Sequence, residues 1–234
     1  MLKGIIRPIS EYNESDITRM YSLMSEFYDN TDRKVFERDF YDKDYCLTLY
    51  HETEGLVGFT TQKLLDVNVN GKIVPGMFSG DTIIHKDYWG STELFRVWAK
   101  YWFEYAERFG EFYWFLICKG YKTYRIMPLF WTEFYPNYKT ETPAYEQSII
   151  DAYAQMLYPD EYNKDTGVIE YKTVKDKLKK GVADIDEHLL KNKDIAYFCK
   201  RNPEHYKGND LACLAKIDKA VIKKRILGMM FDND

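Results

Sequence analysis

Apolar and polar positions along the first part of the chain alternate in a way that predicts strands and helices in turn. The segment GIIRPI (4–9) has the apolar content of a short strand, and Pro8 ends it because proline cannot donate to a sheet ladder. Apolar residues then recur at helical spacing over 17–28 and again over 35–40. The pattern therefore predicts one strand followed by two helices.

Residues 44–85 predict three strands joined by tight turns. The first turn lies in ETEG (52–55), and the second is Asn70-Gly71, a pair typical of two-residue hairpins. Connections this short join antiparallel neighbours, since parallel strands need a much longer crossover. We therefore expect an antiparallel meander.

A helix, a strand and a second helical stretch follow the meander. Apolar residues form one stripe over 94–109, with basic and acidic residues opposite, and Gly110 is well placed to end that helix. FYWFLICK (112–119) is a continuous apolar run, typical of a central strand that is covered on both faces. The segment 120–136 predicts a helix interrupted at Pro128.

This order of elements resembles that of the GNAT-type N-acyltransferases. The resemblance covers residues 2–136 and depends on topology and on one loop, described next. It implies an α/β (α+β) fold: a mixed, mostly antiparallel central sheet, flanked by helices, whose central strands splay apart. It also implies that acyl-coenzyme A is the acyl donor and that an amine is the acceptor. The sequence indicates no metal site.

The loop that supports the resemblance is YWGSTEL (88–94), at the start of the predicted helix. The family pattern here is Arg/Gln-x-x-Gly-x-Gly/Ala, whose amides hold the pyrophosphate of the coenzyme. Gly90, Ser91 and Thr92 match its small residues in part, whereas Trp89 replaces the basic residue and Glu93 adds a competing negative charge. Taken alone, Gly-Ser-Thr is equally a plain helix cap.

The resemblance also indicates where the chemistry would occur. The donor arm would lie between the splayed strands, and a backbone amide of Thr82, Ile83 or Ile84 would polarise the thioester carbonyl. Asp81 is the best placed general base because it lies within an apolar strand, where desolvation raises the pKa of a carboxyl group. His85, at the strand end, is the alternative base. Asp81 also has a purely structural interpretation as a polar residue at a strand kink, and His85 as a surface loop histidine.

The general acid is less clear from the sequence. In many family members a tyrosine on the helix after the second splayed strand protonates the leaving thiolate. Phe130 stands at that position here, so the phenol is missing. Tyr124 and Tyr121 lie one or two turns earlier and are the candidate substitutes, although either could equally be structural.

The remainder of the chain, 141–234, predicts added helices and a late strand, DLACLAKI (210–217). No Pro- or Gly-rich linker precedes it. We expect an acyltransferase core over 1–140 and a C-terminal elaboration over 141–234 that packs on the same domain.

Composition adds expectations about partners and location. The net charge is −4, but residues 171–234 hold 15 Lys and Arg against 10 Asp and Glu. This basic part could receive an acidic acyl carrier protein, and the 17% aromatic content could suit a long-chain acyl group. No nucleic-acid motif, signal peptide or membrane span is present, which indicates a cytoplasmic protein.

Two functions are therefore compatible with the sequence. The first is an N-acyltransferase that acylates a small-molecule or peptide amine from acyl-coenzyme A. The second is a catalytically inactive module of the same fold that binds acyl-coenzyme A or regulates a partner. The missing tyrosine and the partial loop match motivate the second.

Overall fold

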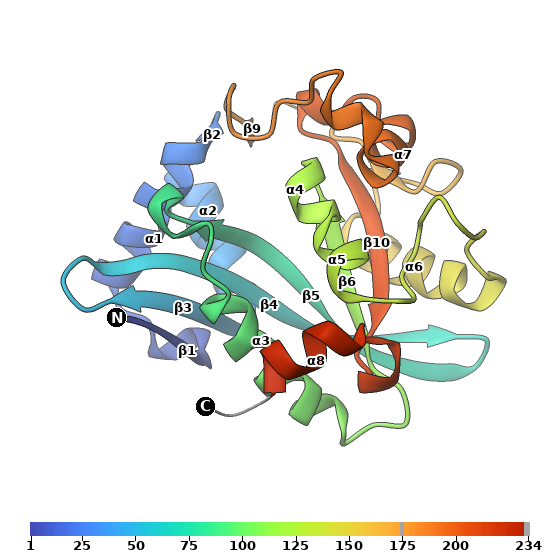
Figure 1. The fold of residues 1–234 in the computed structure, drawn as a ribbon, viewed down its shortest axis with the longest axis horizontal. Coiled ribbons are helices and arrows are strands. Elements are labelled where there is room, and N and C mark those ends of the chain that lie inside the picture. The colour runs from blue at the N-terminus through green and yellow to red at the C-terminus, as the bar shows by residue number, and fades with distance from the viewer. Residues whose placement is uncertain (174–175, 232–234) are drawn as a thin grey trace.

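The computed structural model describes residues 1–173 and 176–231 and contains an eight-stranded main sheet (Figure 1). The strand order is β1-β3-β4-β5-β6-β10-β8-β7. Their bounds are β1 Leu2–Pro8, β3 Tyr45–His51, β4 Gly55–Val69, β5 Lys72–Ile84, β6 Tyr113–Cys118, β7 Tyr162–Asn163, β8 Val168–Ile169 and β10 Asp210–Lys216. Neighbours are antiparallel except β5 and β6, which are parallel. The predicted mixed, mostly antiparallel sheet is confirmed.

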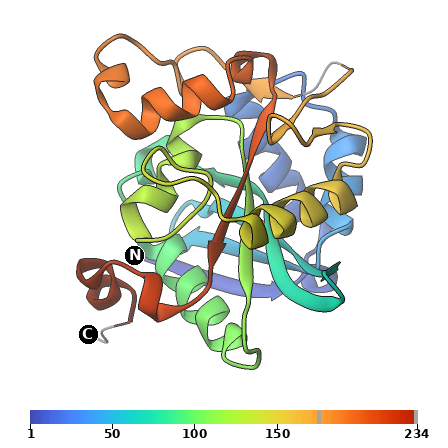
Figure 2. The ribbon, with the colours of Figure 1, turned by 90° about the vertical axis from the view of Figure 1, so that its right-hand side faces the viewer.

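Helices cover both faces of this sheet, as the two views show (Figures 1 and 2). One face carries α1 (Glu14–Phe27), α2 (Arg33–Tyr41) and α6 (Ala144–Leu157), which pack on residues such as Phe59 and Phe115. The other face carries α3 (Glu93–Ala106), α4 (Tyr121–Tyr124), α5 (Ile126–Phe130), α7 (Lys193–Arg201) and α8 (Lys224–Phe231). The core is thus divided by the sheet into two layers.

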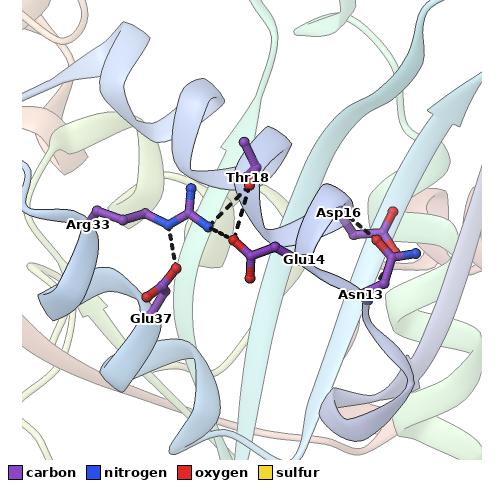
Figure 3. A network of polar contacts seen from close by, with 6 residues as sticks. All are labelled: Asn13, Glu14, Asp16, Thr18, Arg33 and Glu37. Atoms are coloured by element: carbon purple, nitrogen blue, oxygen red, sulfur yellow. Dashed lines mark hydrogen bonds and ion pairs between the residues drawn. The ribbon is translucent and has the colours of Figure 1, made fainter.

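Polar contacts join α1 to α2 (Figure 3). The Asn13 side chain accepts from the Asp16 amide at 3.0 Å and so caps α1. Arg33 of α2 then donates to Glu14 at 2.6 Å and to Glu37 at 2.5 Å. The bond to Glu14 joins the two helices, which lie over the outer half of the sheet, and the bond to Glu37 lies within α2.

The parallel pairing of β5 and β6 is short, and the strands then separate. Gly76–Ser79 pair with Tyr113–Leu116, whereas β5 runs on to Ile84 and β6 to Cys118 without pairing to each other. Figure 1 shows the two strands diverging from this point. The predicted splay of the central strands is therefore present, and it opens the space in which the candidate site lies.

Several features differ from the sequence prediction. Residues 120–136 form two short helices that meet at Arg125, and Pro128 lies inside α5 instead of interrupting it. A second sheet pairs β2 (Tyr28–Asp29) with β9 (Lys177–Leu178) and was not predicted. Strands of two residues leave no periodic pattern in a sequence, because their pairing is long-range.

The region after residue 140 packs on the same sheet. Ile150 and Tyr153 of α6 are buried against Phe115 and Leu214, and β10 lies directly beside β6. The predicted division of the chain near residue 140 stays a prediction, and residues 232–234 of that region lie outside the described part of the chain.

Substitution of Gly76 tests the packing where β5 and β6 meet. A Cβ atom there would collide with the Tyr153 hydroxyl and would lie 2.7 Å from the Tyr113 carbonyl oxygen. Because both neighbours are held in a packed core, we expect Gly76→Ala to lower the free energy of unfolding by about 1–3 kcal/mol. Denaturant titration measures this change. Gly110→Ala is the control, since its Cβ would meet nothing within 4 Å; equal stability of the two variants would contradict the prediction.

Candidate active site

Two adjacent cavities lie where β5 and β6 diverge. The first, about 210 Å³, has four aspartates in its wall and is called the aspartate cavity: Asp39, Asp81, Asp176 and Asp210. The second, about 450 Å³, is called the cleft cavity. Both walls include Tyr28, Thr82 and Thr123. The other lining residues of the cleft cavity are Phe27, Ile83, Ile84, Trp89, Gly120, Lys122, Ile126, Leu178, Val182 and Ala183. The two cavities therefore meet at Thr82 of β5.

Asp81 owes its position to an irregularity in β5. Thr60 pairs with Thr82 and Gln62 with Ser79, so that two residues of β5, Gly80 and Asp81, stand opposite one residue of β4. A β-bulge of this kind bends the strand and changes the direction of its side chains. A Cβ at Gly80 would lie 2.6 Å from a Thr61 hydroxyl. Glycine at this position therefore permits the close approach of β4 that the bulge requires.

The surroundings of Asp81 favour its protonated form. Burial is the largest cause, and the negative charges of Asp39 and Asp176 add to it; together they raise the pKa of Asp81 from 3.8 to about 7. Lys43 and Lys119 act in the opposite direction. A carboxyl group whose pKa lies near neutrality can accept a proton during a reaction at physiological pH.

The lysines near Asp81 are themselves engaged by other carboxylates. Lys43 Nζ lies 2.8 Å from Asp39, and Lys119 Nζ lies 2.7 Å from Asp176. Lys119 also stands 5.8 Å from the centre of the Tyr28 ring. The charges around Asp81 thus form a network and not a simple pair, so its carboxylate is not neutralised by one dedicated cation.

Backbone amides of β5 face the cleft cavity. The His85 amide donates to the Val57 carbonyl of β4 at 2.8 Å. Hydrogen-bonding direction alternates along an antiparallel strand, so Thr82 and Ile84 direct their amides to the opposite edge, from which β6 has diverged. This edge is where the sequence resemblance expected a carbonyl-polarising amide among Thr82, Ile83 and Ile84. By alternation, Ile83 faces β4 instead.

The predicted pyrophosphate loop contributes only Trp89 to the cavity wall. Trp89 is 47% exposed, and its indole N–H donates to the Ile84 carbonyl at 2.7 Å. Gly90, Ser91 and Thr92 line neither cavity and follow Trp89 into the start of α3. The Ser91 hydroxyl accepts from the Glu93 amide at 3.2 Å, and Thr92, the N-cap residue of α3, forms no side-chain cap bond.

Glu93 does not compete for an anion at the helix start. Its carboxylate accepts from the Gly4 amide of β1 at 3.3 Å and pairs with Arg96 at 3.1 Å. The negative charge expected to oppose a phosphate is therefore turned toward β1 and balanced by a cation. Gly90 is exposed, with open space around its Cβ position.

The structure does not bring His85 or Tyr124 to the cavities. His85 lies between two carboxylates, 3.8 Å from Glu26 and 3.6 Å from Asp87. Tyr124 is fully buried and donates to the Pro136 carbonyl at 3.0 Å, and burial raises the pKa of its phenol far above the usual value. Neither residue lines either cavity. The helical position of Tyr124 was visible in the sequence, but the direction of its side chain depended on how α4 packs.

The aromatic stretches expected to line a cleft are mostly core. Phe112, Trp114, Phe115, Trp131 and Phe134 are each no more than 4% exposed. They pack beneath α3 and α6 and line neither cavity. The aromatic content therefore gives no support to a long-chain acyl group.

Sequence reasoning missed three residues of this site. Tyr28 lies in both cavity walls, Lys119 in the wall of the aspartate cavity, and Lys122 in that of the cleft cavity. Tyr28 was assigned to a helical stripe, and it instead begins β2 directly after α1. No local signal distinguishes these residues, because Tyr28 is placed by the unpredicted pairing of β2 with β9 and the two lysines by the course of the chain after β6 and the packing of α4.

Residues 1–173 and 176–231 contain neither a metal-ligand group nor a membrane-spanning helix. No group of three or more His, Cys, Asp or Glu side chains in this part of the chain is arranged to hold a metal ion. No helix there has the length and apolar character needed to cross a membrane.

Comparisons with known proteins give matches at the level of structure. No protein-family model and no curated protein matches the sequence. Similar solved structures include a GNAT family N-acetyltransferase and a probable N-acyltransferase, both at low identity. The Escherichia coli GNAT family N-acetyltransferase YhbS, in complex with CoA, is 14% identical over 51% of this chain and 64% of its own, with a TM-score of 0.37.

Two other matches have similar scores. A probable N-acyltransferase from Enterococcus faecalis V583 is 15% identical over 57% of this chain, with a TM-score of 0.42, and this chain spans only 33% of its length. Arabidopsis thaliana NAA60, in complex with a bisubstrate analogue, is 13% identical over 59% of this chain and 93% of its own, with a TM-score of 0.40.

Replacement of Asp81 by asparagine tests whether the fold raises the pKa of this carboxyl group, because a raised pKa makes the free energy of unfolding depend on pH. The folded protein holds the Asp81 proton more tightly than the unfolded chain does. The contribution of Asp81 to the free energy of unfolding therefore falls as the pH rises from about 4 to about 7. Asparagine removes this loss. We therefore expect Asp81→Asn to raise the free energy of unfolding more at about pH 8 than at about pH 4.

Denaturant titrations at the two pH values measure this difference. Asp66→Asn changes an exposed aspartate of β4 in the same way and should alter stability little at either pH. A gain for Asp81→Asn that is equal at both pH values would show that the pKa of Asp81 is not raised.

Proposed function

We propose that the protein is an N-acyltransferase that transfers an acyl group from acyl-coenzyme A to an amine. The observation that carries the proposal is the junction of the two cavities at Thr82. A carboxyl group with a pKa of about 7 lies on one side of this junction, and backbone amides of an unpaired strand edge lie on the other. A base beside an amide that can stabilise an oxyanion is the arrangement that acyl transfer requires.

The donor fits the cleft cavity and the acceptor fits the aspartate cavity. The pantetheine arm would lie along the open edge of β5, with its thioester carbonyl accepting from the Thr82 or Ile84 amide. The acceptor amine would enter beside Asp81. Its nitrogen attacks the carbonyl carbon, Asp81 takes the proton that the nitrogen loses, and the carbon–sulfur bond breaks as the tetrahedral intermediate collapses.

The leaving thiolate needs a proton, and Tyr28 is the best placed donor. Its ring lies in both cavity walls, and its burial together with the nearby Asp81 raises the pKa of its phenol. The phenol is therefore protonated at neutral pH. This assignment replaces Tyr124, whose hydroxyl donates to a carbonyl within the core.

The start of α3 supports binding of the coenzyme's phosphates. Thr92 and the first residues of α3 present helix-terminal amides, which favour an anion together with the helix dipole. Glu93 is already paired with Arg96 and does not oppose this charge. Open space around Gly90 leaves room for a ligand to approach the backbone.

Asp81→Asn tests the base. Removal of a general base typically slows the chemical step by about 10²–10⁴-fold, and we expect a loss of this size in kcat/KM. The wild-type kcat/KM should rise as the pH passes through about 7, because Asp81 must be deprotonated to accept a proton. That rise should be absent in the variant.

The measurement is a pH profile of the release of the donor's free thiol over a panel of amines. The donors are acyl-coenzyme A from acetyl to long-chain, which release coenzyme A, and an acylated acyl carrier protein, which releases the carrier thiol. His85→Gln is the matched control and should keep the wild-type rate and profile, since His85 lines neither cavity. Binding of coenzyme A without turnover of any pair would instead favour an inactive acyl-coenzyme A-binding module.

Tyr28→Phe tests the general acid. Loss of the hydroxyl should lower kcat by about 10²-fold or more, with little change in KM, because the proton is needed only as the thiolate leaves. Tyr124→Phe removes the same atom from a residue outside the cavities and should leave kcat unchanged. Steady-state kinetics of both variants decides this; equal activity of Tyr28→Phe and wild type would exclude Tyr28.

A further inference from the structure

The wall of the cleft cavity is mostly apolar and carries one charged side chain. Among its described lining residues, Lys122 is the only charged side chain. The rest are aromatic, aliphatic or small, with two threonines and Tyr28 as the polar groups. A cavity of this kind suits a ligand with a long, weakly polar arm and one anionic part.

Lys122 is held at the wall by an aromatic ring. Its ammonium lies 4.1 Å from the centre of the Trp89 indole, a distance at which the ring quadrupole attracts a cation. The indole is itself fixed by its hydrogen bond to Ile84, and Phe27 packs against it at 5.7 Å. Lys122 belongs to α4, after β6, whereas Trp89 follows β5. The contact therefore spans the opening between the two diverging strands.

Lys122 lies over the Trp89 ring and has no charged partner among the described residues. Among residues 1–173 and 176–231, no carboxylate forms an ion pair with Lys122. Partial burial lowers its pKa, because the ammonium loses some of its hydration without gaining a counter-ion. An anionic ligand would supply that counter-ion and would displace little protein structure, since the side chain is exposed.

We propose that Lys122, positioned by Trp89, binds a phosphate group of the coenzyme at the opening of the cleft cavity. This inference depends on the proposed function and identifies the cation that the loop at 89–92 lacks. Trp89 contributes to binding indirectly. Its indole holds the Lys122 side chain in one place, so less side-chain entropy is lost when the phosphate binds.

Isothermal titration calorimetry of the full chain with three probes tests the assignment. The probes are coenzyme A, 4′-phosphopantetheine and pantetheine, which carry decreasing numbers of phosphate groups. Lys122→Met should weaken binding of coenzyme A about tenfold, the loss typical of one charge-assisted hydrogen bond, and should leave pantetheine binding unchanged. Lys122→Arg should retain most of the affinity, since it keeps the cation.

Trp89→Phe and a surface lysine complete the experiment. Trp89→Phe keeps a ring but loses the bond to Ile84, and it should weaken coenzyme A binding in the wild type but not in the Lys122→Met background. Lys86→Met changes an exposed lysine that lines neither cavity and should bind all probes as the wild type does. Thermal unfolding of each variant verifies folding.

The outcomes separate the two proposals. If coenzyme A binds the wild type and Lys122→Met with equal affinity, the Lys122 assignment is wrong and the proposed function stands. Equal weakening of all three probes would also overturn it, because a phosphate contact cannot affect pantetheine. If the wild type binds none of the probes, the proposed function and this inference both fail.

Discussion

The separation of β5 from β6 is the constraint on which the candidate site depends. Four residues of each strand pair, and beyond Ser79 each strand has lost its neighbour on that side. Backbone amides that would be satisfied in a continuous sheet then face a cavity, and such groups require a partner. The candidate site therefore lies at a gap in the hydrogen bonding of the sheet, where unpaired backbone amides and the side chains of the cavity walls face the same space.

The bulge at Gly80 and Asp81 connects this gap to the chemistry that we propose. It lies just past the last paired residue of β5, and it places one carboxyl group among other carboxylates, aromatic rings and paired lysines. The resulting rise in the pKa of Asp81 has an energetic cost in the folded state, since a charge is disfavoured where it is buried. Poor solvation of this kind is expected at a functional site and is balanced by packing elsewhere, as in the dense aromatic core beneath α3.

The second sheet closes the site and joins the two parts of the chain. Tyr28 and Asp29 follow α1, and Lys177 and Leu178 come from the C-terminal region, yet they pair directly above the splayed strands. Leu178 Cδ1 lies so close to Gly120 that a Cβ there would stand at 2.8 Å from it. The C-terminal region thus forms part of the cavity wall, because Leu178, Val182 and Ala183 line the cleft cavity.

Local patterns in the sequence were sufficient for most strands of the main sheet, whereas the role of Asp81 stays a prediction. The turn at Asn70-Gly71, the apolar run at 113–118 and the helical stripe of α3 each carry a short-range signal, and their order led to the splayed sheet. The side chains that surround the cavities carry no such signal. His85 and Tyr124 lie at the expected points of the chain, but they face a carboxylate pair and the core respectively.

What the sequence by itself determined was therefore the identity and order of the regular elements, because periodicity and turn chemistry act over a few residues. The tertiary structure alone decided which side chains meet at the cleft: Tyr28 from the end of α1, Lys119 and Lys122 after β6, and Leu178 from the distant C-terminal region. Those contacts arise from β2–β9 pairing and from the packing of α4, both of which bring together residues far apart in the chain. Physical interactions of that range leave no periodic trace in the sequence.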